Sequence, residues 1–351
     1  MRKLTIVVGV LLAVHVALLF VRPSGSAQAA GGGQTVGDRG VNVGIVLDVG
    51  GLGDKSFNDG AYTGAMRAEK ELGAHIRLIE PGEESDRESG LRLLAAEHMN
   101  LVIGVGFIFT DDVTQLAKEY PDVNFAVVDY AIATDKAGNP IPPPPNVAAL
   151  KFKEEEGSFL VGALAALVSQ SKKVGFVGGM DVPLIQKFEA GFKAGVKAVC
   201  ASCSVISQYA GVTPIAFRNP GKGKELALSQ YQQGVDVIYH ASGSTGLGVF
   251  EAARQTGKYA IGVDADQYSE APGRVLTSMV KGIDVAVLDA IRKVKEHTFK
   301  GGVFTYGLAE NGVGYVYDAN NKAMIPDSVR TRLEQIKADI VSGKIKVPST
   351  R

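Results

Sequence analysis

Four residues with carboxylate or aromatic side chains come just after apolar runs that have the length of buried strands: Asp48, Phe107, Asp129 and Asp264. In open α/β sheets, small ligands bind at the edge formed by the carboxyl ends of the strands. Carboxylates there would accept hydrogen bonds from N–H or hydroxyl groups, and a ring would stack on a flat ligand. A single Asp at a strand end is as often a helix cap or a turn residue. The joint placement of the four indicates a small-molecule binding cleft.

The stretch from Val41 to Gly73 combines an apolar run, a glycine-rich turn and a segment of helical character. It predicts strand, loop and helix, with Phe57 and Asn58 at the start of the helix. The dipeptide Lys55-Ser56 invites comparison with a phosphate-binding loop, which needs glycine one and six positions before the lysine. An acid and a valine stand at those positions, and the acid would repel phosphate, so we reject a phosphate site.

No arrangement in the sequence predicts an enzyme, a metal centre or a cofactor site. The five histidines have no partner at metal-ligand spacing, and there is no Gly-x-Ser-x-Gly elbow. The turn at Gly243 departs from the dinucleotide fingerprint because Glu251 stands where a third glycine is needed. A ligand at the helix start and plain packing explain this turn equally well. Cys200 and Cys203 follow a helix and precede a strand, which indicates a structural disulfide or two free thiols rather than a redox motif.

Composition and charge argue against one broad class of partner. Lys plus Arg and Asp plus Glu are 37 each, which disfavours a nucleic-acid binder. The length of 351 residues suggests about two domains, and 43 glycines suit many tight turns between strands and helices.

Apolar strand runs and helical runs alternate along the chain with short connections, which predicts parallel sheets with helices on both faces. The rhythm restarts near Val174, so we expect an α/β protein of two doubly wound parallel-sheet lobes joined by a multi-strand hinge. Lobe 1 is predicted to comprise residues 42–150 plus about 276–302. Lobe 2 is predicted to comprise residues 151–275 plus about 303–351.

The first residues have the features of an export signal. Basic residues precede an apolar stretch from Leu4 to Val21, and Ala27-Gln28-Ala29 has the small-x-small form of a cleavage site. We expect residues 1–29 to be a signal peptide and residues 30–41 a flexible linker. An uncleaved membrane anchor is the alternative. A lipoprotein anchor is not supported, because no cysteine lies near the site. Cleavage removes three basic residues and leaves 34 basic against 37 acidic ones, a net charge of −3.

Several motifs together carry a resemblance to a known family. They lie at Asp48 to Asn58, Val174 to Met180, Pro183 to Phe192, Ile261 to Gln267 and Thr277 to Lys281. The chain resembles the basic membrane protein (BMP) family of PnrA-like purine-nucleoside receptors, which are substrate-binding proteins of ABC importers. The resemblance spans roughly Val43 to Val347 and implies the type I periplasmic-binding fold.

The resemblance also implies roles for nine residues. A nucleoside base would lie between Phe57 and Phe188, and Asn58 and Asp129 would bond its edge. The ribose hydroxyls would be held by a carboxylate and an ammonium group. The ribose pair would be Asp264 and Lys281, Gly243 and Phe107 would lie close by, and Asp48 would line the pocket. The full set is Asp48, Phe57, Asn58, Phe107, Asp129, Phe188, Gly243, Asp264 and Lys281.

We therefore expect an exported, monomeric binding protein without cofactor or nucleic-acid partner. It would bind a nucleoside, with a purine base favoured, close about its hinge and deliver the ligand to an ABC-transporter permease. It would be periplasmic after signal cleavage or tethered by an uncleaved leader. Three alternatives stay open: a receptor for another small ligand such as a sugar or signalling molecule, a sensor rather than a transport component, and an enzyme acting on nucleosides.

Overall fold

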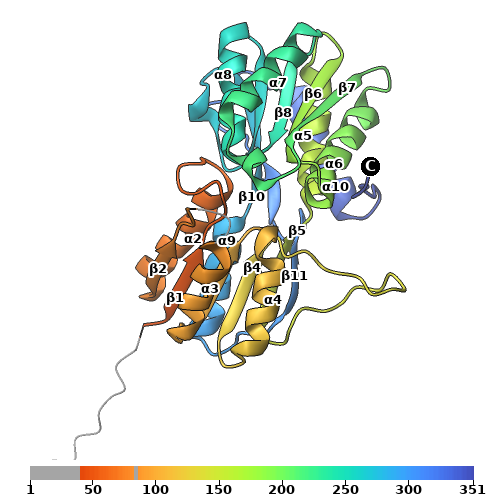
Figure 1. The fold of residues 1–351 in the computed structure, drawn as a ribbon. Helices are drawn as coiled ribbons and strands as arrows, with labels where there is room; N and C mark the ends of the chain where they lie inside the picture. The colour runs from red at the N-terminus through yellow and green to blue at the C-terminus, as the bar shows by residue number, and fades with distance from the viewer. Residues whose placement is uncertain (1–39, 83–85) are drawn as a thin grey trace, which may run out of the picture. The chain divides into compact units, whose positions relative to one another are not determined.

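The computed structural model describes residues 40–82 and 86–351. The expected signal peptide and nearly all of the expected linker lie outside these residues. Two six-stranded sheets organise the described chain (Figure 1). We call the sheets with their covering helices lobe 1 and lobe 2. Among the described residues, no helix combines the length and the apolar character needed to cross a membrane.

The sheet of lobe 1 is entirely parallel and has the order β11-β5-β4-β3-β1-β2. Its strands are β1 (Asn42–Val46), β2 (His75–Ile79), β3 (Leu101–Val105), β4 (Asn124–Val128), β5 (Val147–Phe152) and β11 (Gly302–Tyr306). The central strands are buried on both faces, as expected for a parallel sheet between helices.

Helices cover both faces of this sheet (Figure 1). They are α2 (Phe57–Leu72), α3 (Asp86–Ala96), α4 (Thr110–Glu119) and α9 (Ile283–Lys295), with the 3-10 helix η1 (Phe107–Phe109) ahead of α4. Alternate strand residues divide between the faces: Val43 and Ile45 pack towards α2 and α9, and Val46 packs towards α3 and α4. Helices α2 and α9 can approach closely because Gly64 has no side chain. A Cβ at this position would stand 2.5 Å from the carbonyl oxygen of Asp284 and would push the helices apart.

The sheet of lobe 2 repeats this order as β12-β10-β9-β8-β6-β7, and within it only β12 runs antiparallel to its neighbour. Its strands are β6 (Lys173–Met180), β7 (Ser204–Gly211), β8 (Val237–Ala241), β9 (Tyr259–Asp264), β10 (Val275–Lys281) and β12 (Val313–Tyr315). Its helices are α5 (Glu154–Val168), α6 (Pro183–Val199), α7 (Pro220–Gln232), α8 (Gly246–Thr256) and α10 (Asp327–Val341), with the 3-10 helices η2 (Pro214–Phe217), η3 (Gly243–Thr245) and η4 (Tyr268–Glu270).

The chain passes between the lobes three times, and two passages differ from the sequence-based boundaries. Strand β10 pairs with β9 and so belongs to lobe 2, which moves the second crossing from residue 276 to Gly282. Strand β11 pairs with β5 in lobe 1, so the chain leaves lobe 1 after Tyr306 rather than near residue 303. The first crossing lies between Phe152 and Glu154. An apolar run predicts a buried strand but does not show which of two similar sheets the strand joins.

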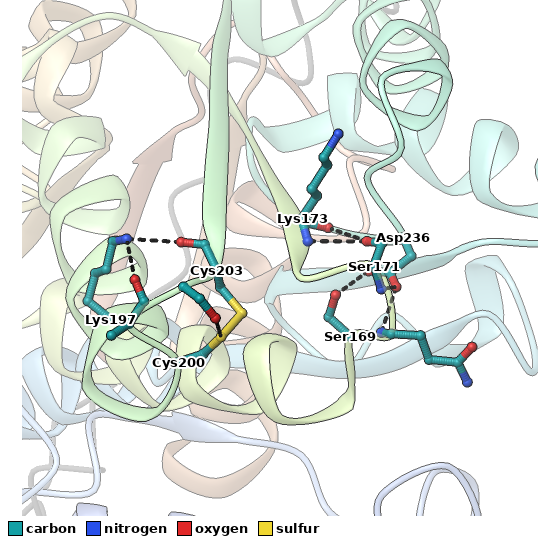
Figure 2. Close-up of a disulfide and its surroundings, with 10 residues drawn as sticks. Ser169, Ser171, Lys173, Lys197, Cys200, Cys203 and Asp236 are labelled. Carbon is teal, nitrogen blue, oxygen red and sulfur yellow. Dashed lines mark hydrogen bonds between the residues drawn. A yellow bond between two sulfur atoms is a disulfide. The ribbon is translucent and has the colours of Figure 1, made fainter.

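The two cysteines form a disulfide between Cys200 and Cys203, which lie between α6 and β7 (Figure 2). Lys197 Nζ donates hydrogen bonds to the carbonyl oxygens of Ala201 and Cys203 and so holds the same turn. Because β7 begins directly after Cys203, the disulfide lies at the amino edge of the sheet, opposite the edge where the strands end. This arrangement agrees with a structural role and not with a redox motif at the start of a helix.

Candidate functional site

One cavity at the carboxyl edges of both sheets is lined by all nine residues singled out from the sequence. It contains about 650 Å³ of space not filled by atoms, the space at its mouth included. The nine come from positions between Asp48 and Lys281 and from both lobes. Asp54, Ser242 and Phe217 also line the cavity and were not among the residues predicted.

The loop after β1 orients Asp48 towards the cavity through Asn58. The Asn58 side chain donates to Asp48 Oδ1 (2.6 Å) and to Asp54 Oδ2 (3.0 Å), and its oxygen accepts from the Asp48 N–H (3.0 Å). Both amide hydrogens of Asn58 are therefore used within the loop, and the side chain is buried. Asn58 lies at the predicted place, but its contacts are those of a residue that positions Asp48 rather than one that bonds a ligand edge.

Asp54 serves the start of α2. Its carboxylate accepts hydrogen bonds from the backbone N–H groups of Ser56, Asn58 and Asp59 (2.9, 2.8 and 3.2 Å). These are the N–H groups that a helix start leaves without partners, and a negative charge there is favoured by the helix dipole. The acid that argues against a phosphate loop in the sequence thus has a structural task.

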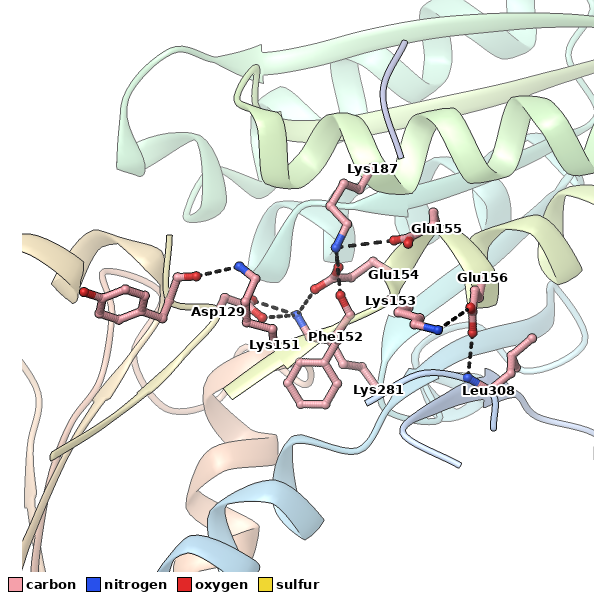
Figure 3. Close-up of polar contacts among 11 residues, drawn as sticks. Asp129, Lys151, Phe152, Lys153, Glu154, Glu155, Glu156, Lys187, Lys281 and Leu308 are labelled. Carbon is pink, nitrogen blue, oxygen red and sulfur yellow. Dashed lines mark hydrogen bonds and ion pairs between the residues drawn. The ribbon is translucent and has the colours of Figure 1, made fainter. Parts of the chain in front are cut away.

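Lys281, at the end of β10, lies at the centre of a buried ionic cluster (Figure 3). Its Nζ lies 2.7 and 2.6 Å from the two carboxylate oxygens of Asp129 in lobe 1, and 3.1 Å from Glu154 Oε1 at the start of α5. Lys187 Nζ lies 2.5 Å from the other oxygen of Glu154. Burial alone would lower the pKa of Lys281, but the charges of Asp129 and Glu154 outweigh it and raise that pKa. Lys281 is therefore charged, and its ammonium joins the lobes.

The rings of Phe57 and Phe188 border the same ammonium from opposite lobes. Lys281 Nζ lies 5.2 Å from the ring centroid of Phe57 and 5.6 Å from that of Phe188. Phe57 begins α2, and Phe188 lies in the second turn of α6. The structure brings these two predicted rings to one cavity, and both lie within cation–π distance of the same ammonium.

Asp264 supplies a second contact between the lobes. Its Oδ2 accepts a hydrogen bond of 2.5 Å from Ser56 Oγ. Nearby, Gln267 Nε2 donates to the carbonyl oxygen of Lys55 (2.9 Å). Burial raises the pKa of Asp264 to about 7, against the opposing attraction of Lys281. These contacts and the pairing of Lys281 with Asp129 all span the cleft.

Two carboxylate oxygens on the cavity are not used by other described residues. Asp48 Oδ2 and Asp264 Oδ1 accept no hydrogen bond within residues 40–82 and 86–351. Burial raises the pKa of Asp48 to about 6, against hydrogen bonds from Asn58 and Gly50. Among the described carboxylates, the cavity therefore offers one unshared oxygen from each lobe, whereas Asp129 has both oxygens on Lys281.

Two further aromatic rings line the cavity. Phe107 of η1 and Phe217 of η2 meet edge to face, with centroids 6.5 Å apart. Gly243 has a φ of 55°, and a Cβ there would stand 3.1 Å from the carbonyl oxygen of Phe217. Phe217 lies in a short 3-10 helix without apolar periodicity, so no sequence signal pointed to it. Within the described residues, no group of three His, Cys, Asp or Glu side chains is arranged to hold a metal ion.

Comparison with known proteins gives a consistent result. A sequence model described as "ABC transporter substrate-binding protein PnrA-like" (Bmp) matches residues 41–351. A "CD4+ T-cell-stimulating antigen" of Listeria monocytogenes is 37% identical over 330 residues, covering 87% of each chain. An "ABC transporter nucleoside-binding protein BmpA" of Lactococcus lactis is 34% identical over 327 residues, covering 87% of this chain and 88% of the relative. A crystal structure of an ABC-transporter solute-binding protein from Aeropyrum pernix superposes with a TM-score of 0.80 at 30% identity, covering 89% of this chain and 94% of the other.

Proposed function

The chain belongs to the Bmp family of PnrA-like ABC-transporter substrate-binding proteins, and from this premise we propose that it captures a nucleoside, with a purine base favoured, for import. Binding rather than catalysis is the role of this family. The observation that carries the proposal is the composition of the cavity: the two lobes face each other with phenyl rings, Phe57 opposite Phe188 among them, and each lobe contributes one unshared carboxylate oxygen.

The two rings suit a flat ligand. Phe57 and Phe188 come from opposite lobes and border one space, so a base inserted between them would be stacked on both faces. Stacking contributes about 1–3 kcal/mol per base in single-strand binding sites, and it grows with the size of the flat ring system. This physics favours a purine over a pyrimidine. The Lactococcus relative, described as nucleoside-binding, supports the same ligand class.

The charges suit a neutral ligand that donates hydrogen bonds. The unshared acceptors, Asp48 Oδ2 and Asp264 Oδ1, would receive N–H groups of the base or hydroxyls of the ribose. Among the described residues that line the cavity, Lys281 is the one cation, and Asp129 and Glu154 already neutralise it. A phosphate would meet carboxylates without a free cation, so a nucleoside is favoured over a nucleotide. This assignment moves the base-edge role from Asn58 and Asp129 to Asp48.

Ligand binding is proposed to stabilise the closed arrangement of the lobes. Ser56 with Asp264 and Asp129 with Lys281 already span the cleft. A ligand held by rings and carboxylates from both lobes adds contacts that exist only when the lobes are close, and it therefore shifts the population towards closure. The closed state would be delivered, by a monomer outside the cytoplasm, to the permease of an ABC importer.

Calorimetric titration tests the proposal. Adenosine, guanosine and inosine should bind with one site per chain, uridine and cytidine more weakly, and the corresponding monophosphates and free ribose weakest. Mass spectrometry of the ligand carried by the purified protein is an independent check. Binding of ribose or another sugar as tight as that of any nucleoside would instead support a sugar receptor. Release of free base from a bound nucleoside would support an enzyme.

A further inference from the structure

A chain of buried hydrogen bonds leads from the cavity wall at Ser242, through His240, to Gln267. Ser242 Oγ lies 3.3 Å from His240 Nδ1, and His240 Nε2 lies 3.1 Å from Gln267 Oε1. All three side chains are at most 1% exposed. Gln267 Nε2 continues the chain to the carbonyl oxygen of Lys55 in lobe 1. The nine residues predicted from the sequence include none of these three.

The orientation of the Gln267 amide follows from its two backbone partners. Its oxygen accepts from the Val263 N–H (2.8 Å), and its nitrogen donates to the Lys55 carbonyl (2.9 Å). Exchanging oxygen and nitrogen would set donor against donor at Val263 and acceptor against acceptor at Lys55. Gln267 therefore presents an oxygen, and only an oxygen, to His240.

This oxygen determines the tautomer of His240. An acceptor facing Nε2 requires a proton on Nε2, and burial lowers the pKa of the imidazole to about 4, which keeps it neutral. A neutral ring with a proton on Nε2 has a lone pair on Nδ1. The Ser242 hydroxyl must then donate its one hydrogen to Nδ1.

We propose that the pair His240–Gln267 fixes Ser242 as a hydrogen-bond acceptor towards the cavity, so that Ser242 selects a ligand carrying an N–H or O–H donor at that point. This inference rests on the proposed function and deepens it by naming a specificity residue. Ser242 contacts the ligand, and His240 and Gln267 are positioning residues. Because Gln267 also bonds Lys55, the acceptor is fixed by the same side chain that joins the lobes.

Two glycines leave the space that the side chains of His240 and Gln267 occupy. A Cβ at Gly246 would stand 2.0 Å from His240 Cε1, and a Cβ at Gly262 would stand 2.8 Å from Gln267 Oε1. The ring of Phe250 packs edge to face on His240 with centroids 5.0 Å apart. The imidazole therefore occupies space that a side chain at position 246 would fill, and a ring turned over about its Cβ–Cγ bond would present Cε1, not a nitrogen, to Gln267.

The tautomer can be read without any ligand. In protein labelled with ¹⁵N-histidine, long-range nitrogen–proton spectra should show His240 with a protonated Nε2 and an unprotonated Nδ1 between pH 5.5 and 8. The signal is assigned by its loss in His240→Gln. A proton on Nδ1, or a doubly protonated ring in this range, would overturn the proposal.

A double-mutant cycle, in which one change is made in the protein and the other in the ligand, tests whether Ser242 selects a ligand donor. Wild type and Ser242→Ala are titrated with a purine nucleoside and with analogues that each lack one donor: the 2′-, 3′- and 5′-deoxy forms and the ribosides without a base N–H. Ser242→Ala should weaken binding of the parent nucleoside roughly 5- to 100-fold. It should leave the affinity unchanged for the one analogue that lacks the donor facing Ser242. A uniform loss over all analogues, or no loss for any, would contradict it.

Two further variants separate positioning from structure. His240→Phe keeps the ring volume but removes the Nδ1 acceptor, so the Ser242 hydroxyl can turn, and the discrimination among analogues should shrink while the parent still binds. Ser158→Ala is the matched control, because it removes a buried lobe 2 hydroxyl that bonds Tyr239 and does not line the cavity. It should leave every affinity ratio unchanged. If wild type binds no nucleoside, the proposed function fails, whereas the tautomer measurement still decides the hydrogen-bond chain.

Discussion

Asp129 and Asp264 occupy equivalent positions in the two lobes. Asp129 follows β4 and Asp264 ends β9, and these strands hold the same place in the two sheet orders. Both residues adopt the left-handed backbone conformation, with φ of 64° and 66°, which Asp tolerates better than most residues. Their partners differ: Asp129 pairs with Lys281, and Asp264 accepts the hydroxyl of Ser56. One repeated strand end thus supplies an ion pair in one lobe and an acceptor in the other.

Replacing either ring of the proposed stack should weaken nucleoside binding. Phe57→Leu and Phe188→Leu keep apolar volume but remove the flat face, and each should reduce affinity for a purine nucleoside about 5- to 100-fold. Calorimetry measures the affinity, and thermal melting checks the fold. Phe304→Leu in β11 is the matched control because Phe304 packs away from the cavity. Equal affinities in all three variants would refute the stacking role.

Removing the Lys281 ammonium should destabilise the protein strongly. Lys281→Met leaves Asp129 buried without its partner, and breaking a buried pair from one side costs about 3–5 kcal/mol. The double variant with Asp129→Asn should recover much of the loss, because Glu154 keeps Lys187. Denaturant unfolding measures each free energy. Lys344→Met removes an exposed pair with Asp339 and should cost at most about 1 kcal/mol. A loss no larger for Lys281→Met than for this control would contradict the prediction.

The stability of the ligand-free protein should fall, relative to Asp264→Asn, as pH rises from 4 to 7. The pKa of Asp264 is raised from 3.8 to about 7 by burial, so between these values the folded protein holds a proton that the unfolded chain releases. Unfolding then becomes easier with rising pH. Asn cannot ionise, so the free energy of unfolding of the variant should rise by about 1–2 kcal/mol relative to wild type over this range. This is less than the whole pKa shift would give, because the Asp264 carboxyl is only half-buried. Denaturation at several pH values checks this, and a constant difference would disprove it.

Nucleoside affinity should change with pH in the opposite direction. Hydroxyl and N–H donors bond better to an ionised carboxylate, and the pKa values of Asp48 and Asp264 are about 6 and 7. Affinity should therefore rise from pH 5 to pH 8, with release of protons on binding. Titrations in two buffers of different ionisation enthalpy measure that release. Asp264→Asn should flatten the upper part of the profile, and an unchanged profile would argue against contact with Asp264.

Loss of the disulfide should lower stability without changing ligand binding. Cys200 and Cys203 close a loop of four residues, so the chain-entropy model gives a cost of about 2 kcal/mol. The bridge lies at the sheet edge opposite the cavity. The double variant Cys200→Ser/Cys203→Ser should melt earlier than wild type and bind nucleoside equally well. A reductant should have the same effect on wild type and none on the variant; a fall in affinity would show coupling to the cleft.

The placement of the cavity residues follows from a rule that the sequence can express. Asp48, Asp129 and Asp264 each come after an apolar run, and parallel strands end at a common edge, so they gather wherever the sheets form. The residues that pair with these carboxylates cannot be identified from the sequence in the same way. Lys281 pairs with Asp129 across 152 positions of sequence, and no periodicity connects the two. The side-chain amide of Asn58 in α2 already donates to Asp48 and Asp54 in the preceding loop, and only side-chain geometry shows that these bonds compete with a ligand.

The three passages between the lobes have a consequence for the order in which the protein can fold. Lobe 1 receives its edge strand β11 only with Gly302–Tyr306, and lobe 2 receives β12 later still. During synthesis, neither sheet can be completed until most of the chain has emerged. A fragment that ends at Phe152, at the first passage, would lack α9 and β11. The edge of β5 that pairs with β11 would then be unpaired. A fragment that ends at Phe152 is therefore not expected to form a complete lobe 1, and each sheet depends for its edge on strands from the last fifty residues of the chain.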